Sequence, residues 1–159
     1  MSTCLWFSGQ AEEAVKFYLS IFKDGKILEE CRYTEEHALH NGYAGGSILA
    51  IWFEILDRKF IAMNAKPIVQ FNESVSFVVE CETQAEIDYY WERLTSDGGE
   101  EIQCGWLKDK FGVTWQVTPV MMAKMVCDSD PAKVARVMAT FGPMKKIDLA
   151  SIEKAYRGD

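Results

Sequence analysis

The sequence predicts an α+β protein built from two βαβββ modules that are followed by C-terminal helices. The first observation is an internal repeat, because the Gln-Ala-Glu run at residues 10–12 recurs at residues 84–86 and the Asp-Gly pair at 24–25 recurs at 97–98. The second is that one short β-type run precedes each copy and three follow it. A displacement of about half the chain indicates one supersecondary unit used twice.

The first module begins with a short strand and an amphipathic helix. Residues 4–7 are mostly apolar and lead into turn-prone residues, which is typical of a strand that ends before a helix. From residue 11 to 22 the apolar side chains recur every three or four positions, which predicts a helix with one buried face. Three strands are expected next, at residues 26–34, 47–55 and 59–64, with a hairpin spacing between the last two.

The second module repeats this order in a shorter form. A strand at 75–79 precedes a helix that starts at Gln84 and has Trp91 on its apolar face. Three short strands are expected next, at residues 100–103, 105–108 and 113–118, with Gly112 at a turn.

A βαβββ module leaves one face of its sheet free, because its helix covers only the other face. Pairing two modules would turn the free faces toward a shared cleft, which is the natural place for a functional site. We therefore expect one domain over residues 1–159. It comprises a first module at 1–67, a second at 72–119 and a C-terminal helical extension at 120–159.

The extension is predicted to contain a short Met-rich helix at 120–127 and two longer ones. The second starts with Asp130 as N-cap and Pro131 in the first turn, places Met138 on its inward face, and stops at the Gly-Pro pair 142–143. The last helix is capped by Asp148 or Ser151.

Composition limits the function classes. Apolar residues make up 48% and charged residues 26% of the 159, as in ordinary globular proteins. The net charge of −7 opposes binding to a nucleic-acid backbone. The chain has neither an apolar run long enough to span a membrane nor a secretory pattern at its start, so a cytoplasmic protein is expected. The five cysteines are an odd number without a CxxC pair, so no disulfide framework is expected.

Three segments resemble a known family. They are Cys4-Leu5-Trp6-Phe7 with the following Gly9–Ala14, Phe71–Glu73 with Ser76–Val79, and Cys104–Gly112 with Trp115-Gln116. The chain thereby resembles the PhnB-like group of the glyoxalase/bleomycin-resistance superfamily, whose members often carry the label 3-demethylubiquinone-9 3-methyltransferase. The resemblance implies the vicinal oxygen chelate fold, in which two βαβββ modules form a glyoxalase-like cup, and a homodimer.

In metal-using members of the superfamily, a His, Gln or Glu projects into the cup from the first and last strands of each module. The matching positions here are Thr3 or Leu5, Ala62 or Asn64, Ser74 or Ser76, and Gln116. Only Gln116 is a plausible ligand of a divalent metal, because hydroxyl and Asn side chains are weak ligands. No metal or cofactor is therefore expected, and Asn64, Ser76 and Gln116 would instead contact a neutral polar ligand or bond one another.

The remaining walls of the predicted cup are apolar. If Asn64 and Gln116 face the cup, strand alternation turns Trp115 and Trp6 toward the helices and leaves Phe7 on the cup side. The sequence does not decide whether Trp106 faces the cup or the helices. The candidate ligand-binding residues are therefore Phe7, Asn64, Ser76, Cys104, Trp106 and Gln116.

Two local motifs have alternative interpretations. His37 and His40 lie in a segment, 35–46, whose glycines indicate a loop; they either form part of a metal site with Glu35 or Glu36, or are a chance pair on a loop that closes over the cup. The residues Lys108-Asp109 either polarise a carbonyl and move a proton, or belong to a tight turn in which Asp bonds its own backbone.

Two functional classes follow. One is a metal-independent enzyme or binding protein for a small, partly apolar metabolite, and the other is a non-catalytic homodimer that sequesters its ligand. Methyl transfer is not favoured, because neither Gly45-Gly46, which precedes a strand, nor Gly98-Gly99, which follows a helix, has the context of a nucleotide-binding turn.

Overall fold

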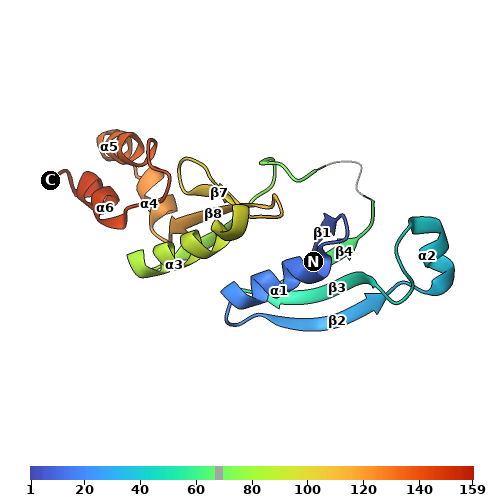
Figure 1. Cartoon of the computed structure of the whole chain (residues 1–159). Helices are drawn as coiled ribbons and strands as arrows, with labels where there is room; N and C mark the ends of the chain where they lie inside the picture. The colour runs from blue at the N-terminus through green and yellow to red at the C-terminus, as the bar shows by residue number, and fades with distance from the viewer. Residues whose placement is uncertain (67–69) are drawn as a thin grey trace. The chain divides into compact units, whose positions relative to one another are not determined.

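The chain folds into two compact units, residues 1–70 and 71–159, each built on one four-stranded mixed sheet (Figure 1). The structure is a computed structural model that describes residues 1–66 and 70–159, without the side chains of residues 38, 39 and 41. The predicted end of the first module, at residue 67, lies outside the described residues.

The first unit has the predicted β-α-β-β-β order, with one additional helix. Its elements are β1 (Thr3–Phe7), α1 (Ala11–Ile21), β2 (Lys26–Arg32), α2 (Glu35–Asn41), β3 (Ile48–Ile55) and β4 (Arg58–Asn64). The strand order in the sheet is β1-β4-β3-β2, with β1 parallel to β4 and the other pairs antiparallel. This confirms the α+β class.

Helix α1 packs on β3 and β4. Its apolar positions recur every three or four residues, so Ala14, Val15 and Tyr18 all lie on one face and are fully buried. The ring of Tyr18 stacks on Phe53 of β3 at 6.1 Å between centroids, and this contact forms the centre of the first core.

The predicted hairpin joins β3 to β4 through a two-residue turn. Leu56 and Asp57 both have positive φ, 48° and 56°, which gives the turn the backbone twist that tight hairpins require. Asp24 accepts a hydrogen bond of 2.7 Å from the Leu56 N–H, and this bond stabilises a conformation that is unusual for leucine.

The segment 35–46, predicted to be a loop, contains the short helix α2. Thr34 caps this helix by accepting a hydrogen bond from the His37 N–H at 3.3 Å. The loop prediction was wrong because the glycines lie after the helix, where Gly42 and Gly46 both have positive φ.

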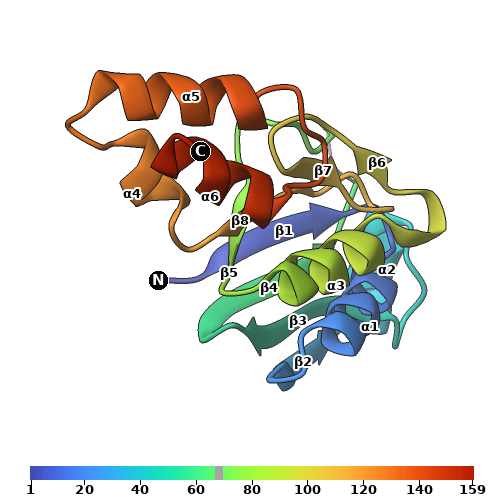
Figure 2. The same ribbon diagram turned by 90° about the vertical axis from the view of Figure 1, so that its left-hand side faces the viewer.

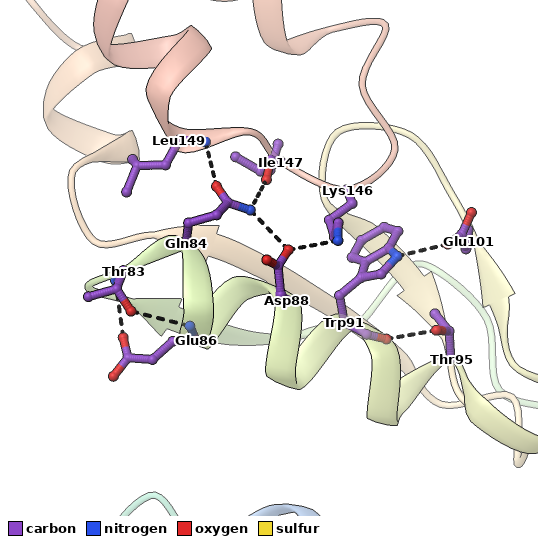
Figure 3. A network of polar contacts seen from close by, with 10 residues as sticks. All are labelled: Thr83, Gln84, Glu86, Asp88, Trp91, Thr95, Glu101, Lys146, Ile147 and Leu149. Atoms are coloured by element: carbon purple, nitrogen blue, oxygen red, sulfur yellow. Dashed lines mark hydrogen bonds and ion pairs between the residues drawn. The ribbon is translucent and has the colours of Figure 1, made fainter.

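The second unit repeats the module. It contains β5 (Phe77–Cys81), α3 (Gln84–Leu94), the 3-10 turn η1 (Ser96–Gly98), β6 (Glu100–Glu101), β7 (Trp106–Lys108) and β8 (Thr114–Pro119). The strand order β5-β8-β7-β6 matches that of the first sheet, with β5 parallel to β8. Thr83 and Glu86 form a reciprocal capping box at the start of α3, which explains why the helix begins there (Figure 3).

Three helices complete the second unit: α4 (Met122–Val126), α5 (Pro131–Phe141) and α6 (Leu149–Arg157), which lie together in Figure 2. Asp130 caps α5 and Asp148 caps α6, as two of the predicted start signals require. The predicted inward orientation of Met138 was wrong: its side chain is 49% exposed, and Val137 is the buried residue of α5.

A polar network fastens the start of α6 to α3 (Figure 3). The Gln84 side chain donates to the Ile147 carbonyl at 3.0 Å and accepts from the Leu149 N–H at 2.8 Å. Lys146 forms an ion pair with Asp88, one helical turn further along α3, at 2.7 Å. These bonds fix the C-terminal segment against the helix of the second module. Among the helices formed by the described residues, no helix is long and apolar enough to cross a membrane.

Candidate functional site

The second sheet has one face beneath α3 and one helix-free face. Val79, Leu107, Trp115 and Val117 alternate onto the helix side and are buried. Their neighbours along the strands point the other way. These neighbours, Val78, Glu80, Trp106, Lys108 and Gln116, form what we call the open face of the second sheet; Thr114 shares their side of the sheet but is buried.

The polar centre of the open face is a hydrogen bond between Gln116 and Ser76. Gln116 donates from its side-chain nitrogen to the Ser76 hydroxyl at 2.7 Å. This bond uses one N–H of an amide that has a second N–H and a carbonyl oxygen, and neither of these bonds another described residue. The pair therefore presents a neutral donor and a neutral acceptor.

Trp106 lies beside this pair. In the register of β7 and β8 it is directly opposite Gln116, and its indole is half-buried. Directly opposite residues have Cβ atoms about 5 Å apart, so the indole and the amide belong to one patch. The structure thus assigns Trp106 to the open face, a choice that the sequence leaves undecided.

Phe7 and Asn64 lie elsewhere, and the predicted strand parity of the first module was wrong. Both residues point toward α1, where they are 2% and 4% exposed. Asn64 accepts a hydrogen bond from the Ala11 N–H at 2.9 Å and donates to the Ile48 carbonyl at 3.1 Å. Its amide caps α1, whose N-cap residue Gln10 makes no capping bond of its own.

Trp6 precedes Phe7 in β1, so its side chain points to the other face of the first sheet. This face is free of helices, and Trp6 is 39% exposed there. Trp52, Ile61 and Met63 share this face by their register with β1 and β4. Trp6 was predicted to lie beneath the helix, so this apolar face was not expected from the sequence.

Cys104 lies in the turn before β7, outside the sheet. It has a positive φ of 61°, its N–H donates to the Met144 carbonyl at 2.6 Å, and its thiol approaches the Gly142 carbonyl at 3.3 Å. These contacts direct the side chain toward the C-terminal segment.

Of the two interpretations of Lys108-Asp109, the structure supports the turn for Asp109. Its buried carboxylate accepts three hydrogen bonds, from the Phe111 and Val113 N–H groups and from the Trp115 indole, at 2.9 to 3.0 Å. Gly112 adopts the positive φ of 84° that this turn needs.

Lys108 itself, one of the two residues that the sequence offered for polarising a carbonyl, lies on the open face. It pairs with Glu73 at 2.5 Å, and Glu100 lies 3.9 Å away. The hydrogen bond that the Lys108 ammonium donates to the Glu73 carboxylate raises the pKa of Lys108, which keeps the ammonium charged. Its spacing of two residues from Trp106 puts both side chains on the same side of the strand.

The predicted histidine pair lies in α2. The Nδ1 of His37 is 3.2 Å from the Thr34 hydroxyl. The Glu35 carboxylate lies against Gly45, so close that a Cβ at this position would contact it. Within residues 1–66 and 70–159 no three His, Cys, Asp or Glu side chains come together as a metal-binding group.

A chain of two βαβββ modules, each with one helix-covered and one helix-free sheet face, has the glyoxalase fold. The family model described as 3-demethylubiquinone-9 3-methyltransferase matches residues 1–118, and the chain belongs to this PhnB-like family of the glyoxalase superfamily. The resemblance drawn from the sequence is thereby confirmed.

Solved structures agree with this assignment. The PhnB protein of Bacillus cereus, a putative 3-demethylubiquinone-9 3-methyltransferase, is 31% identical, with 76% of this chain and 98% of that one covered and a TM-score of 0.66. Protein PA1353 of Pseudomonas aeruginosa, 17% identical, shares the fold over 75% and 96% of the two chains with a TM-score of 0.58. The fosfomycin resistance protein FosX of Listeria monocytogenes, solved with Mn(II) and sulfate, does so at 13% identity over 79% and 93%, with a TM-score of 0.53. No curated protein matches the chain.

Proposed function

We propose that the open face of the second sheet binds a small, partly apolar metabolite without a metal ion. The observation that carries this proposal is the juxtaposition of the Trp106 indole with the hydrogen-bonded pair Gln116 and Ser76. The indole offers a flat apolar surface, and the amide offers an N–H and a carbonyl oxygen for a polar substituent. A few polar groups beside an aromatic wall are typical of small-molecule sites.

The side chains of this patch favour binding over acid–base chemistry. Indole, amide and hydroxyl groups do not titrate near neutral pH, so Trp106, Gln116 and Ser76 offer no general base. This favours the alternative that the protein sequesters its ligand, as a homodimer of the bleomycin-resistance type, over turnover of the ligand. Light scattering of the purified protein tests the homodimer.

Methyl transfer, the activity in the family description, does not enter the proposal. Gly45 and Gly46 precede β3, and Gly98 and Gly99 follow α3, so neither pair leads from a strand into a helix as a nucleotide-binding turn does.

Binding is tested with N-phenyl-1-naphthylamine, a neutral apolar dye that fluoresces when it leaves water. We expect saturable binding that weakens about tenfold in Trp106→Ala and severalfold in Gln116→Leu. Trp6→Ala, which removes a partly exposed indole from the first sheet, is the matched control. Loss of dye binding in Trp6→Ala alone would move the site to the first sheet and refute the proposal.

The metal-free part is tested separately by metal analysis of protein purified without chelators, together with melting curves with and without Ni²⁺, Zn²⁺, Mn²⁺ and Fe²⁺. We expect no bound metal and no specific shift. Near-stoichiometric metal, or a large stabilisation by one ion, would overturn this part of the proposal.

A further inference from the structure

Lys108 and Trp106 lie on the same side of β7, two residues apart. The strand rises about 3.3 Å per residue, so their side chains leave the sheet about 7 Å from each other. A ligand seated on the indole therefore has an ammonium group within reach at one end. The register partners of Lys108 are Glu100 on β6 and the buried Thr114 on β8.

The counter-ion of Lys108 comes from a loop. Glu73 precedes β5, and its side chain is 54% exposed, whereas the Lys108 side chain is 28% exposed. The backbone of this loop is fixed independently of the ion pair: the Asn72 side chain accepts from the Ser74 N–H at 2.9 Å, and the Asn72 carbonyl accepts from the Thr114 hydroxyl at 3.3 Å. The Glu73 carboxylate can therefore leave Lys108 by side-chain rotation alone.

We propose that Lys108 anchors an anionic group of the ligand, and that the Glu73 carboxylate occupies this position until the ligand displaces it. The ligand class is then a small organic monoanion, with an apolar body on Trp106 and a carboxylate or a similar group at Lys108. This inference rests on the proposed function and adds a charge requirement to it.

Three properties of the described residues support the exchange. An ion pair with a half-exposed partner is weak, so replacing Glu73 costs little. The ammonium keeps an anionic partner after the exchange, and the displaced Glu73 carboxylate, whose side chain is 54% exposed, is solvated by water. Glu100, 3.9 Å from the ammonium, adds a second negative charge nearby, which disfavours a dianion and selects a single negative charge.

The test uses two dyes with a similar apolar body. 8-Anilinonaphthalene-1-sulfonate carries one negative charge, and N-phenyl-1-naphthylamine carries none. We expect Lys108→Met to weaken binding of the sulfonate about tenfold, because it removes a charge-assisted contact. We expect Glu73→Gln to strengthen it about threefold, because it removes a weak competitor. Binding of the neutral dye should change by less than about twofold in both variants.

The opposite signs of the two variants distinguish this inference from a general charge effect. Lys110→Met, which removes an equal charge from the adjacent turn, is the matched control and should leave the preference for the sulfonate intact. Lys108→Arg should retain it. Circular dichroism and melting curves establish that each variant is folded before titration.

The failure of this inference differs from the failure of the proposed function. If the neutral dye binds at Trp106 but neither Lys108→Met nor Glu73→Gln alters sulfonate binding, the charge requirement is refuted and the proposed site stands. If Trp106→Ala affects neither dye, both proposals are refuted. If Glu73→Gln weakens sulfonate binding as Lys108→Met does, Glu73 supports the site and does not compete for it, and the displacement is refuted.

Discussion

The side-chain oxygen of Asn64, the last residue of β4, accepts a hydrogen bond of 2.9 Å from the backbone N–H of Ala11, the first residue of α1. Because the capping residue lies 53 positions from Ala11, this hydrogen bond joins the start of α1 to the end of β4. The same amide donates to the Ile48 carbonyl on β3. One buried side chain thus satisfies groups of two elements that lie far apart in the sequence.

Replacing Asn64 with Ala should destabilise the first unit by about 2–4 kcal/mol, because it removes a helix cap and leaves a buried carbonyl unsatisfied. Urea unfolding followed by far-UV circular dichroism measures this loss. The matched control is Asn72→Ala, which removes an exposed amide that accepts a hydrogen bond from the Ser74 N–H of its own loop, and it should cost less than about 1 kcal/mol. Equal effects of the two substitutions would contradict the capping role.

Gly105→Ala should be more destabilising than Gly46→Ala. Both glycines have φ near 80°, where a side chain costs about 1–2 kcal/mol. At Gly105 a Cβ would also lie 2.7 Å from the Val117 carbonyl oxygen, whereas at Gly46 nothing lies within 4 Å. The difference between the two unfolding free energies, about 1–3 kcal/mol, measures the backbone shift that the clash forces. A Gly105→Ala protein as stable as Gly46→Ala would mean that the turn relaxes freely.

Cys81 should resist alkylation in the folded protein. It is 1% exposed, and burial, with a smaller contribution from Glu86, raises the pKa of its thiol to about 12. Since the thiolate is the reactive form, iodoacetamide should label Cys81 at least about 100-fold more slowly than the exposed Cys31 and Cys127. Peptide mass spectrometry after timed labelling compares the three rates, and in urea they should converge. Labelling of Cys81 at the rate of Cys31 under native conditions would show that β5 is open to solvent.

The stability of the second unit should fall below about pH 4. Hydrogen bonding from Lys146 lowers the pKa of Asp88, and hydrogen bonds from Ser151 lower the pKa of Asp148. A carboxyl with a lowered folded-state pKa contributes stability above its unfolded value, about 3.9, and loses it as the pH falls through the lower folded value. Urea unfolding between pH 6 and 2 should show this loss.

The paired variants Asp88→Asn and Asp148→Asn should flatten this pH profile, and so should 0.5 M salt, because both carboxyls are at least partly exposed. A profile unchanged by both substitutions would assign the acid sensitivity to other groups.

Local signals predicted most of the fold. The apolar period of α1 and α3, the Asp130-Pro131 start of α5 and the Gly112 turn are each specified by residues close in sequence, and all three appear in the structure. The start of α6 was predicted with two alternative caps, and Asp148 fills the role. The prediction of a loop at residues 35–46 was wrong, because the glycines of this segment obscured the signal of a helix of only seven residues.

The candidate site was less predictable, because strand parity depends on which of two adjacent aromatic residues is buried. Trp6 and Phe7 are both large and apolar, and no local rule decides between them. The outcome is decided by Asn64, whose amide is needed at the start of α1 and which therefore brings its register partner Phe7 to the same face. In the second module the Gln116 side chain bonds Ser76 and does not cap the helix, and Trp115 lies beneath α3 as predicted. The ligand-binding roles of Ser76, Trp106 and Gln116 remain predictions.

The role of Lys108 was left open in the sequence for a related reason. The residues that follow it form a turn, and this turn accounts for the presence of Asp109 and Gly112 in the sequence. The turn does not determine to which side of the sheet the Lys108 side chain points. Its spacing from Trp106 puts both residues on one side of β7, and the pairing of β7 with β8 shows that this side also carries Gln116.

The turn before β7 is held by the chain's C-terminal part. The N–H groups of Cys104 and Gly105 donate to the carbonyls of Met144 and Lys145, and this leads directly into the strand that carries Trp106. The segment that defines family membership ends at residue 118. The working unit of the protein is therefore longer than the segment by which its family is identified. A chain cut to the family boundary would keep the four strands of the second sheet and lose the anchor that orients one of them. Comparative biochemistry across this family should use whole chains.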